Sequence, residues 1–302
     1  MRYSVLSLVL WQFMAMTPVV GNDSLVVQGE YLVRAAGCVS CHTDHDNNGA
    51  YLAGGRVLAT PFGKFYVPNI TADKQHGVGA WSDEDFINAL QQGVSPSGDH
   101  YYPAFPYTSY TRLTTADIRA IAAYLRSVQA VARVNREHEL PWYVFRWMIG
   151  FWKWLYFEPG EFKSAADKSA SHNRGAYLVA IGHCTECHTP RNDIGVLDDS
   201  RFLGGVKEGP EGEAIPNITP DRQTGIGKWR EGELAYFLES GELPDGDYTG
   251  SLMAEVVDDG TRYLNKSDRR AMARYLLTIP AIANPDFRKK AKKKKQVVED
   301  EW

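Results

Sequence analysis

Two stretches of the sequence each place two thiols and an imidazole within five residues. They read Cys-Val-Ser-Cys-His at 38–42 and Cys-Thr-Glu-Cys-His at 184–188. Thiols at this spacing lie on one turn of chain and can add across the two vinyl groups of a haem, whose iron the adjacent histidine binds. The pattern predicts two covalent c-type haems, haem 1 and haem 2, attached through Cys38, Cys41, Cys184 and Cys187, with His42 and His188 as axial ligands.

A zinc site or a redox dithiol is the alternative, because two Cys-x-x-Cys pairs can supply four thiolates to one zinc ion. The histidine after each pair and the repeat around both motifs favour haem. The chain has only four cysteines, so none remains for a disulfide or a separate thiolate site.

The motifs belong to a long internal repeat. Gly29–Val33 precedes the first motif as Gly175–Val179 precedes the second, and Pro-Asn-Ile-Thr follows at 68–71 and 216–219. Each copy is long enough for a domain with its own core. Capping and periodicity predict mainly helical copies, with helices at 30–36, from Ser82, at 118–128 capped from Thr115, at 174–182, at 231–240, and at 267–277 capped by Ser267.

Extending the repeat aligns Phe105 with Met253. A thioether binds haem iron and a phenyl ring does not, so Met253 is predicted as the sixth ligand of haem 2. Haem 1 must then be five-coordinate, bind water, or use another side chain. Phe105 itself is expected as an apolar wall against the porphyrin.

The N-terminus has the basic, apolar and small-residue order of a secretory signal, which predicts an exported, periplasmic protein. The alternative is a permanent membrane anchor, against which Gln12, Thr17 and Pro18 interrupt the apolar run. The expected organisation is a signal peptide at 1–21, a haem domain at 22–132, a linker at 133–168, a second haem domain at 169–286 and a charged tail at 287–302.

The linker carries an aromatic run at 140–157 that contains four of the eight tryptophans. Pro141, Arg146, Gly150 and Lys153 argue against a spanning helix. We expect a wedge that buries its rings between the two domains. The alternative is a docking strip for a partner subunit or for the membrane interface, where tryptophan, tyrosine and basic residues gather.

The net charge of −4 and the pI near 6.1 give no electrostatic support for a nucleic-acid partner. A basic block at 288–295 precedes Glu299–Glu301. We expect a solvated tail there, with contact to an acidic partner or anionic lipid as the alternative.

The combined motifs resemble the multihaem cytochrome c subunits of periplasmic alcohol, gluconate and sorbitol dehydrogenases. The resemblance runs from about Gln28 to Pro280 and rests on Asn173–Val179, the Cys-x-x-Cys-His-Thr-Pro-Arg run that ends at Arg191, Pro-Asn-Ile-Thr, and Tyr102–Tyr107. It implies two tandem class I-like cytochrome c domains joined by an aromatic-rich linker. It also implies electron transfer from a flavin- or quinone-cofactor dehydrogenase to a quinone, a soluble cytochrome or a terminal oxidase.

Two departures from that family matter. Its subunits usually bear a third haem domain and a C-terminal membrane helix, so a dihaem relay is expected here in place of direct ubiquinone reduction. Many relatives also have methionine where this chain has Phe105, and His100 in the same loop is the best-placed substitute ligand for haem 1. Arg56, Asn69, Trp81, Asn217 and Trp229 are candidates to bond the haem propionates or cover the haem edge, with core packing as the alternative.

The sequence thus predicts a redox subunit without a catalytic base, nucleophile or substrate pocket. Electrons are expected to enter through haem 1 and leave through haem 2, because the thioether ligand raises the potential of haem 2. The alternative is a dihaem enzyme or sensor that uses an open site on haem 1 to reduce peroxide or bind a small ligand.

Overall fold

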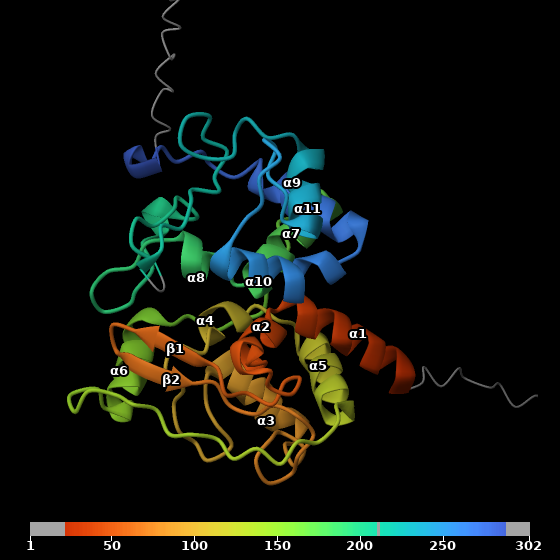
Figure 1. Cartoon of the computed structure of the whole chain (residues 1–302), viewed down its shortest axis with the longest axis vertical. Coiled ribbons are helices and arrows are strands. Elements are labelled where there is room, and N and C mark those ends of the chain that lie inside the picture. The colour runs from red at the N-terminus through yellow and green to blue at the C-terminus, as the bar shows by residue number, and fades with distance from the viewer. Residues whose placement is uncertain (1–21, 210–211, 288–302) are drawn as a thin grey trace, which may run out of the picture.

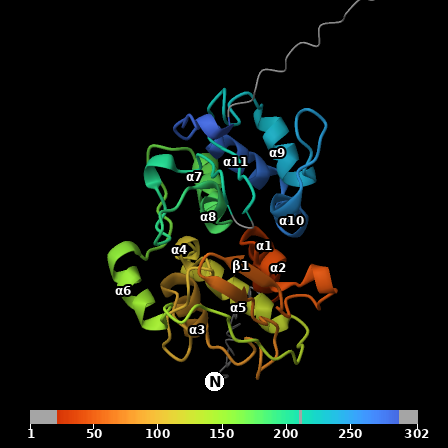
Figure 2. The ribbon, with the colours of Figure 1, turned by 60° about the vertical axis from the view of Figure 1, so that its left-hand side comes forward.

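The computed structural model describes residues 22–209 and 212–287. Its helices gather into two lobes that lie one above the other (Figures 1 and 2). The N-terminal lobe holds residues 22–132 and the C-terminal lobe holds residues 169–287. The signal peptide expected at 1–21 and the basic block of the tail lie outside the described residues.

A pair of crossing helices organises the N-terminal lobe. Helix α1 (Asn22–Ala35) packs along α5 (Thr115–Ser127), and Gly29 allows the close approach because an added Cβ would collide with the Ala120 carbonyl. An antiparallel hairpin pairs Val57 with Tyr66 and Thr60 with Gly63. The remaining elements are α2 (Cys38–His42), a 3₁₀ turn (His45–Asn47), β1 (Val57–Thr60), β2 (Gly63–Tyr66), α3 (Asp83–Ile87) with its π-helical extension (Asn88–Gln92), and α4 (Tyr107–Tyr110).

The C-terminal lobe repeats this crossing. Helix α7 (Ala170–Ile181) packs along α11 (Lys266–Leu276), and Gly175 approaches the Ala271 carbonyl as Gly29 approaches Ala120. The remaining elements are α8 (Cys184–His188), α9 (Glu231–Ser240), α10 (Ser251–Asp259), and 3₁₀ turns at Asp199–Arg201, Thr261–Tyr263 and Pro285–Phe287.

All six predicted helices are present, but two caps differ from expectation. Ser82 caps α3 through a reciprocal bond with Asp85, as predicted. The cap of α5 is Thr114, whose hydroxyl accepts from the Asp117 amide, and the cap of α11 is Asn265. In each case an earlier polar side chain reaches the third amide of the helix and displaces the expected Thr115 or Ser267.

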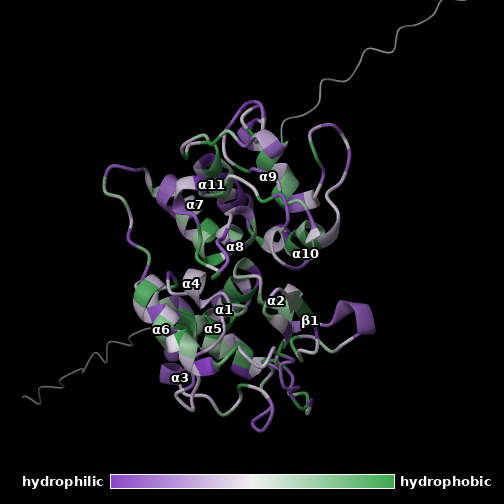
Figure 3. Cartoon of the chain, turned by 90° about the vertical axis from the view of Figure 1, so that its left-hand side faces the viewer, coloured by the Kyte–Doolittle hydropathy of each residue, from purple (hydrophilic) through white to green (hydrophobic). Residues whose placement is uncertain are grey.

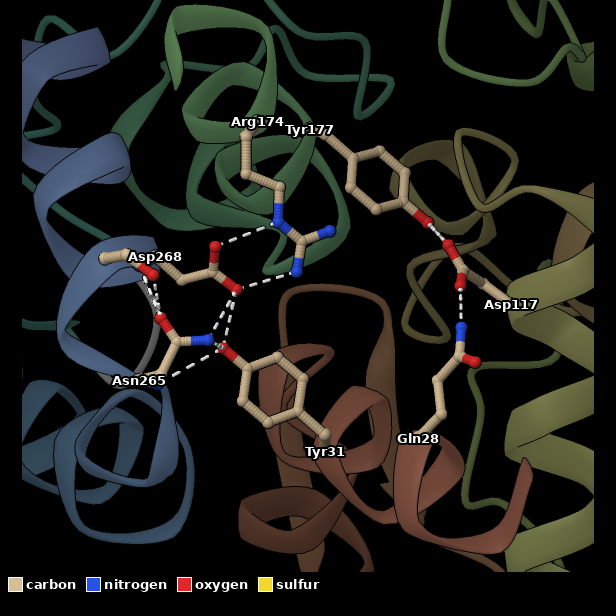
Figure 4. Close-up of polar contacts among 8 residues, drawn as sticks. Gln28, Tyr31, Asp117, Arg174, Tyr177, Asn265 and Asp268 are labelled. Atoms are coloured by element: carbon tan, nitrogen blue, oxygen red, sulfur yellow. Dashed lines mark hydrogen bonds and ion pairs between the residues drawn. The ribbon is translucent and has the colours of Figure 1, made fainter. Parts of the chain in front are cut away.

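Matching polar groups join the lobes (Figure 4). Tyr31 of α1 donates to Asp268 of α11 at 2.6 Å, where Arg174 also binds. Tyr177 of α7 donates to Asp117 of α5. Each tyrosine therefore reaches the aspartate that begins the last helix of the opposite lobe, so the sequence repeat becomes an approximately twofold interface.

The linker forms helix α6 (Arg146–Tyr156) on the outside of the N-terminal lobe (Figure 3). The expected inter-domain wedge is wrong, because Trp142, Trp147 and Trp154 are 84%, 72% and 77% exposed. Lys153 anchors α6 from beneath, buried and bonded to the carbonyls of Gln92 and Gly93. Within residues 22–209 and 212–287, helices long and apolar enough to cross a bilayer are absent.

Candidate haem sites

Each Cys-x-x-Cys-His motif forms its own short helix, α2 or α8. The residue before each helix, Gly37 or His183, adopts a left-handed backbone with φ of 65° or 45°, which ends the preceding helix and starts the new turn. The cysteines at first and fourth position then lie on one helical face, and all four thiols are free of disulfides. This geometry suits two thioether bonds to one haem on each turn.

Backbone carbonyls orient the two histidines that are predicted to be axial ligands. The Nδ1–H group of His42 donates to the Pro68 carbonyl at 2.7 Å, and His188 donates to the Pro216 carbonyl at the same distance. A carbonyl only accepts, so Nδ1 carries the proton and the lone pair lies on Nε2, available to iron. Burial lowers the pKa of His42 to about 4, although the bond to Pro68 acts in the opposite direction. The lowered pKa favours the neutral imidazole, which is the form that binds iron.

Asn69 fixes the loop that supplies this carbonyl. Its side chain donates to the Val131 carbonyl at 2.7 Å and accepts from the backbone amide and the hydroxyl of Thr71. Asn217 makes the matching bonds to the Ile282 carbonyl and to Thr219. Both asparagines are almost fully buried with these groups, and their bonds hold the loops that carry Pro68 and Pro216.

The sequence prediction missed Pro68 and Pro216 as functional residues, although it found the repeated Pro-Asn-Ile-Thr. The signal was the repeat itself. Two distant copies of a four-residue loop, which begin 26 and 28 residues after the predicted axial ligands, indicate a shared task at each ligand. The proline carbonyl performs it, and a carbonyl leaves no mark in side-chain chemistry.

The segments predicted to lie on the distal side of the two haems differ in their local packing. Phe105 packs its ring against Tyr101 and Tyr110, with centroids 5.3 and 5.5 Å away. Met253 lies in the first turn of α10, half-buried against the core. The first segment therefore presents an aromatic cluster and the second a thioether.

The ring of His100 lies against the linker helix. Its Nδ1 is 3.0 Å from the Lys153 ammonium, and its Nε2 faces the backbone of Gly150. Burial, with the positive charge of Lys153, lowers the pKa of His100. Both ring nitrogens thus lie against α6.

Arg56 binds protein groups. Its guanidinium donates to the Ser40 carbonyl at 2.8 Å and pairs with Glu255 of the opposite lobe. The structure thus brings Arg56 to the attachment turn of haem 1, with a carboxylate partner on α10.

The two repeated tryptophans occupy equivalent places. Trp81 packs against Phe86 and Trp229 against Phe237, with centroids 5.3 and 5.5 Å apart, and both are half-buried at the edge of the core. This position fits the packing alternative.

The zinc alternative lacks its geometry. In the described part of the chain, which includes all four cysteines, clusters of three or more histidine, cysteine, aspartate or glutamate side chains arranged to hold a metal ion are absent. The thiols stay in two separate pairs, each with its own oriented imidazole. This donor set fits a covalent haem on each motif.

Comparison with known proteins agrees. The cytochrome c family model matches residues 26–129. A diheme cytochrome c-type protein of Cereibacter sphaeroides is 43% identical over 84% of this chain and 86% of its own length. The gluconate 2-dehydrogenase cytochrome c subunit of Pantoea cypripedii is 37% identical over 93% of this chain and 66% of its own length.

The alcohol dehydrogenase (quinone) cytochrome c subunit of Gluconobacter oxydans is 36% identical over 86% of this chain. The chain spans 56% of the length of that subunit, so it matches only part of it. The internal repeat, the oriented imidazoles and the match over 86% of the length of a diheme relative agree with one another. The chain belongs to the diheme cytochrome c family and carries two covalently attached c-type haems.

Proposed function

We propose that the chain is a periplasmic electron-transfer subunit that receives electrons from a partner dehydrogenase and passes them to a quinone, a soluble cytochrome or a terminal oxidase. Two tandem class I-like domains, at 22–132 and 169–286, hold the haems, and residues 133–168 link them. The relatives that are named as dehydrogenase cytochrome subunits support this role.

One observation carries the proposal: the residues that begin the two attachment turns meet at the lobe interface, where a Cβ added to Gly37 would lie 2.7 Å from Nε2 of His183. Haems attached at these adjoining turns would be neighbours, which suits direct electron transfer between them. The haems supply one-electron redox chemistry, and the protein supplies their ligands, spacing and dielectric.

In this proposal Cys38 and Cys41 attach haem 1, and Cys184 and Cys187 attach haem 2. His42 and His188 are the proximal ligands, and Met253 completes haem 2. Thioether ligation raises a haem potential, so electrons enter through haem 1 and leave through haem 2.

The role is tested by deleting the gene from its host. Respiration on the dehydrogenase substrate should stop, while dehydrogenase activity measured with an artificial dye in the same extracts should persist. Restored respiration from a plasmid copy controls for secondary effects. Loss of the dye-linked activity would instead assign catalysis or assembly to this chain.

The aromatic face of α6 is the proposed contact with the dehydrogenase. It exposes Trp147, Phe151 and Trp154 side by side on consecutive turns. A membrane-surface helix needs outward basic residues. Here Arg146 donates to the His100 carbonyl at 2.8 Å and the Lys153 ammonium is buried, so the outward face is aromatic and a protein partner fits it better.

This assignment is tested with Trp147→Ser/Trp154→Ser. The double variant should lose reduction by the dehydrogenase while its haem spectrum and its chemical reduction by dithionite stay unchanged. Binding of the unmodified protein to phosphatidylethanolamine–phosphatidylglycerol vesicles, lost in the variant, would point to the membrane instead.

A small-ligand function at haem 1 is the second candidate, and the absence of methionine at position 105 favours considering it. Carbon monoxide added to the reduced protein distinguishes the two. Binding of one carbon monoxide per chain would indicate that one haem iron has an open site. An unchanged spectrum would rule out the small-ligand function and leave only the electron-transfer function.

A further inference from the structure

The helix that carries Met253 is held by the opposite lobe. Glu255, two residues after Met253 in α10, pairs with the Arg56 guanidinium, and its second oxygen lies 3.2 Å from Nη2. The same guanidinium donates to the Ser40 carbonyl at 2.8 Å, between Cys38 and Cys41. Arg56 therefore joins the attachment turn of haem 1 to the ligand helix of haem 2.

The far end of α10 is held in the same way. Arg34 donates to the Asp259 carbonyl at 3.1 Å, and the His45 ring lies 2.8 Å from the Asp259 carboxylate. Both Arg34 and His45 belong to the N-terminal lobe. The position of α10 over its own haem is thus determined by contacts with the other lobe at both ends.

The reverse contact exists as well. Glu186 holds in α8 the place that Ser40 holds in α2, third in the motif. Its carboxylate accepts from Thr108 at 2.8 Å and from Ser109 at 2.7 Å, both in α4 directly after the Phe105 segment. Each distal segment therefore rests on the attachment turn of the other haem.

Arg56 is the buried member of the pair. Its side chain is 15% exposed, whereas that of Glu255 is 38% exposed, so removing Glu255 leaves a poorly hydrated guanidinium and removing Arg56 releases α10 from the attachment turn of haem 1. The iron–thioether bond depends on where the backbone of α10 sits. We propose that Arg56 is a positioning residue for the sixth ligand of haem 2, so that the two haem sites are coupled through exchanged distal contacts. This inference rests on the proposed ligation of haem 2 by Met253.

Coupling of this kind is reciprocal by thermodynamic linkage. A ligand that displaces Met253 and loosens α10 must also disturb the attachment turn of haem 1 through Arg56 and Ser40. The spectrum of haem 1 should therefore respond when haem 2 alone changes its ligand.

The test uses cyanide, which competes with Met253 for the ferric iron of the holoprotein. In Arg56→Gln the cyanide affinity of haem 2 should rise about fivefold or more. The near-infrared sulfur-to-iron band should weaken before any cyanide is added. Arg56→Lys keeps a charge for Glu255 and should restore part of the band, whereas Glu255→Gln should behave as Arg56→Gln does.

Arg174→Gln is the matched control, because it removes an interface cation that pairs with Asp268 of α11 instead of α10. It should leave the band and the cyanide affinity unchanged. Unchanged values in both Arg56→Gln and Glu255→Gln, or equal changes in Arg174→Gln, would overturn the positioning role. A band missing from the unmodified protein would instead overturn ligation by Met253, and the inference with it.

Discussion

The two lobes repeat their scaffold closely and differ in the segment that is proposed to face the distal side of each haem. Gly29 and Gly175 allow the same helix crossing, and Pro68 and Pro216 accept from His42 and His188 at the same distance. Phe105 sits in an aromatic cluster, and the aligned position of the second lobe is Met253. The groups that would attach and orient each haem are therefore duplicated, whereas the proposed sixth-ligand position differs.

The largest expected effect removes the thioether from the second lobe. Met253→Ala should abolish the near-infrared band and lower the potential of one haem only, since axial ligands help to set haem potentials over a range of about 0.8 V. Spectroelectrochemical titration of both haems measures this. A band that persists in the variant would mean that another methionine is the ligand.

The reciprocal substitution tests the same difference in the N-terminal lobe. Phe105→Met should give haem 1 a second thioether site and raise its potential, because methionine is flexible and removes little volume. The titration should then show two His/Met haems. If the unmodified protein already shows two, the alignment of Phe105 with Met253 is wrong.

The sequence predicted the haem motifs and the helices, because each depends on side chains at fixed spacing. The capping rule did not identify the capping residue itself, because neighbouring polar side chains compete for the third amide of a helix. Thr115 and Ser267 met the rule for a cap, but Thr114 and Asn265 fill that role. The role of the Pro68 carbonyl lies in the backbone, so composition and spacing could not show it.

In the linker, a contact between residues distant in the sequence reverses a prediction made from local hydrophobicity. An aromatic run predicts burial when only its hydrophobicity is considered. Lys153 reverses this outcome, because its ammonium binds carbonyls at the end of the π-helical turn and fixes which face of α6 points inward. The rings that the sequence placed in a core are therefore on the surface.

A smaller effect tests whether the scaffold is equivalent in both lobes. Asn69→Ala and Asn217→Ala should each lower the free energy of unfolding by about 2–3 kcal/mol, since each leaves buried groups without partners. Denaturant unfolding followed by haem absorbance measures both. A large loss in only one variant would show that the two repeated loops contribute unequally to the free energy of unfolding.

The smallest expected effect lies at the interface, where the twofold match is imperfect: Asp268 binds the cation of Arg174, whereas Asp117 binds the amide of Gln28. Burial by itself raises the pKa of Asp268, but the bonds from Arg174 and Tyr31 outweigh it and hold the pKa below its usual range. A carboxyl with a lowered folded pKa stabilises the fold above its unfolded pKa of about 3.9, and this stability is lost as the pH falls through the folded value.

Asp268→Asn should therefore lower the free energy of unfolding by about 1 kcal/mol near neutral pH, a modest loss because Arg174 is 39% exposed. The difference from the unmodified protein should shrink as the pH falls below about 4, where the wild-type carboxyl also becomes neutral. Unfolding in urea at several pH values measures this. Asp117→Asn keeps the Gln28 and Tyr177 partners and serves as the control at neutral pH, where its loss should be smaller. An equal loss at neutral pH in both variants would mean that the added cation contributes nothing and that the two sides of the interface are energetically equivalent.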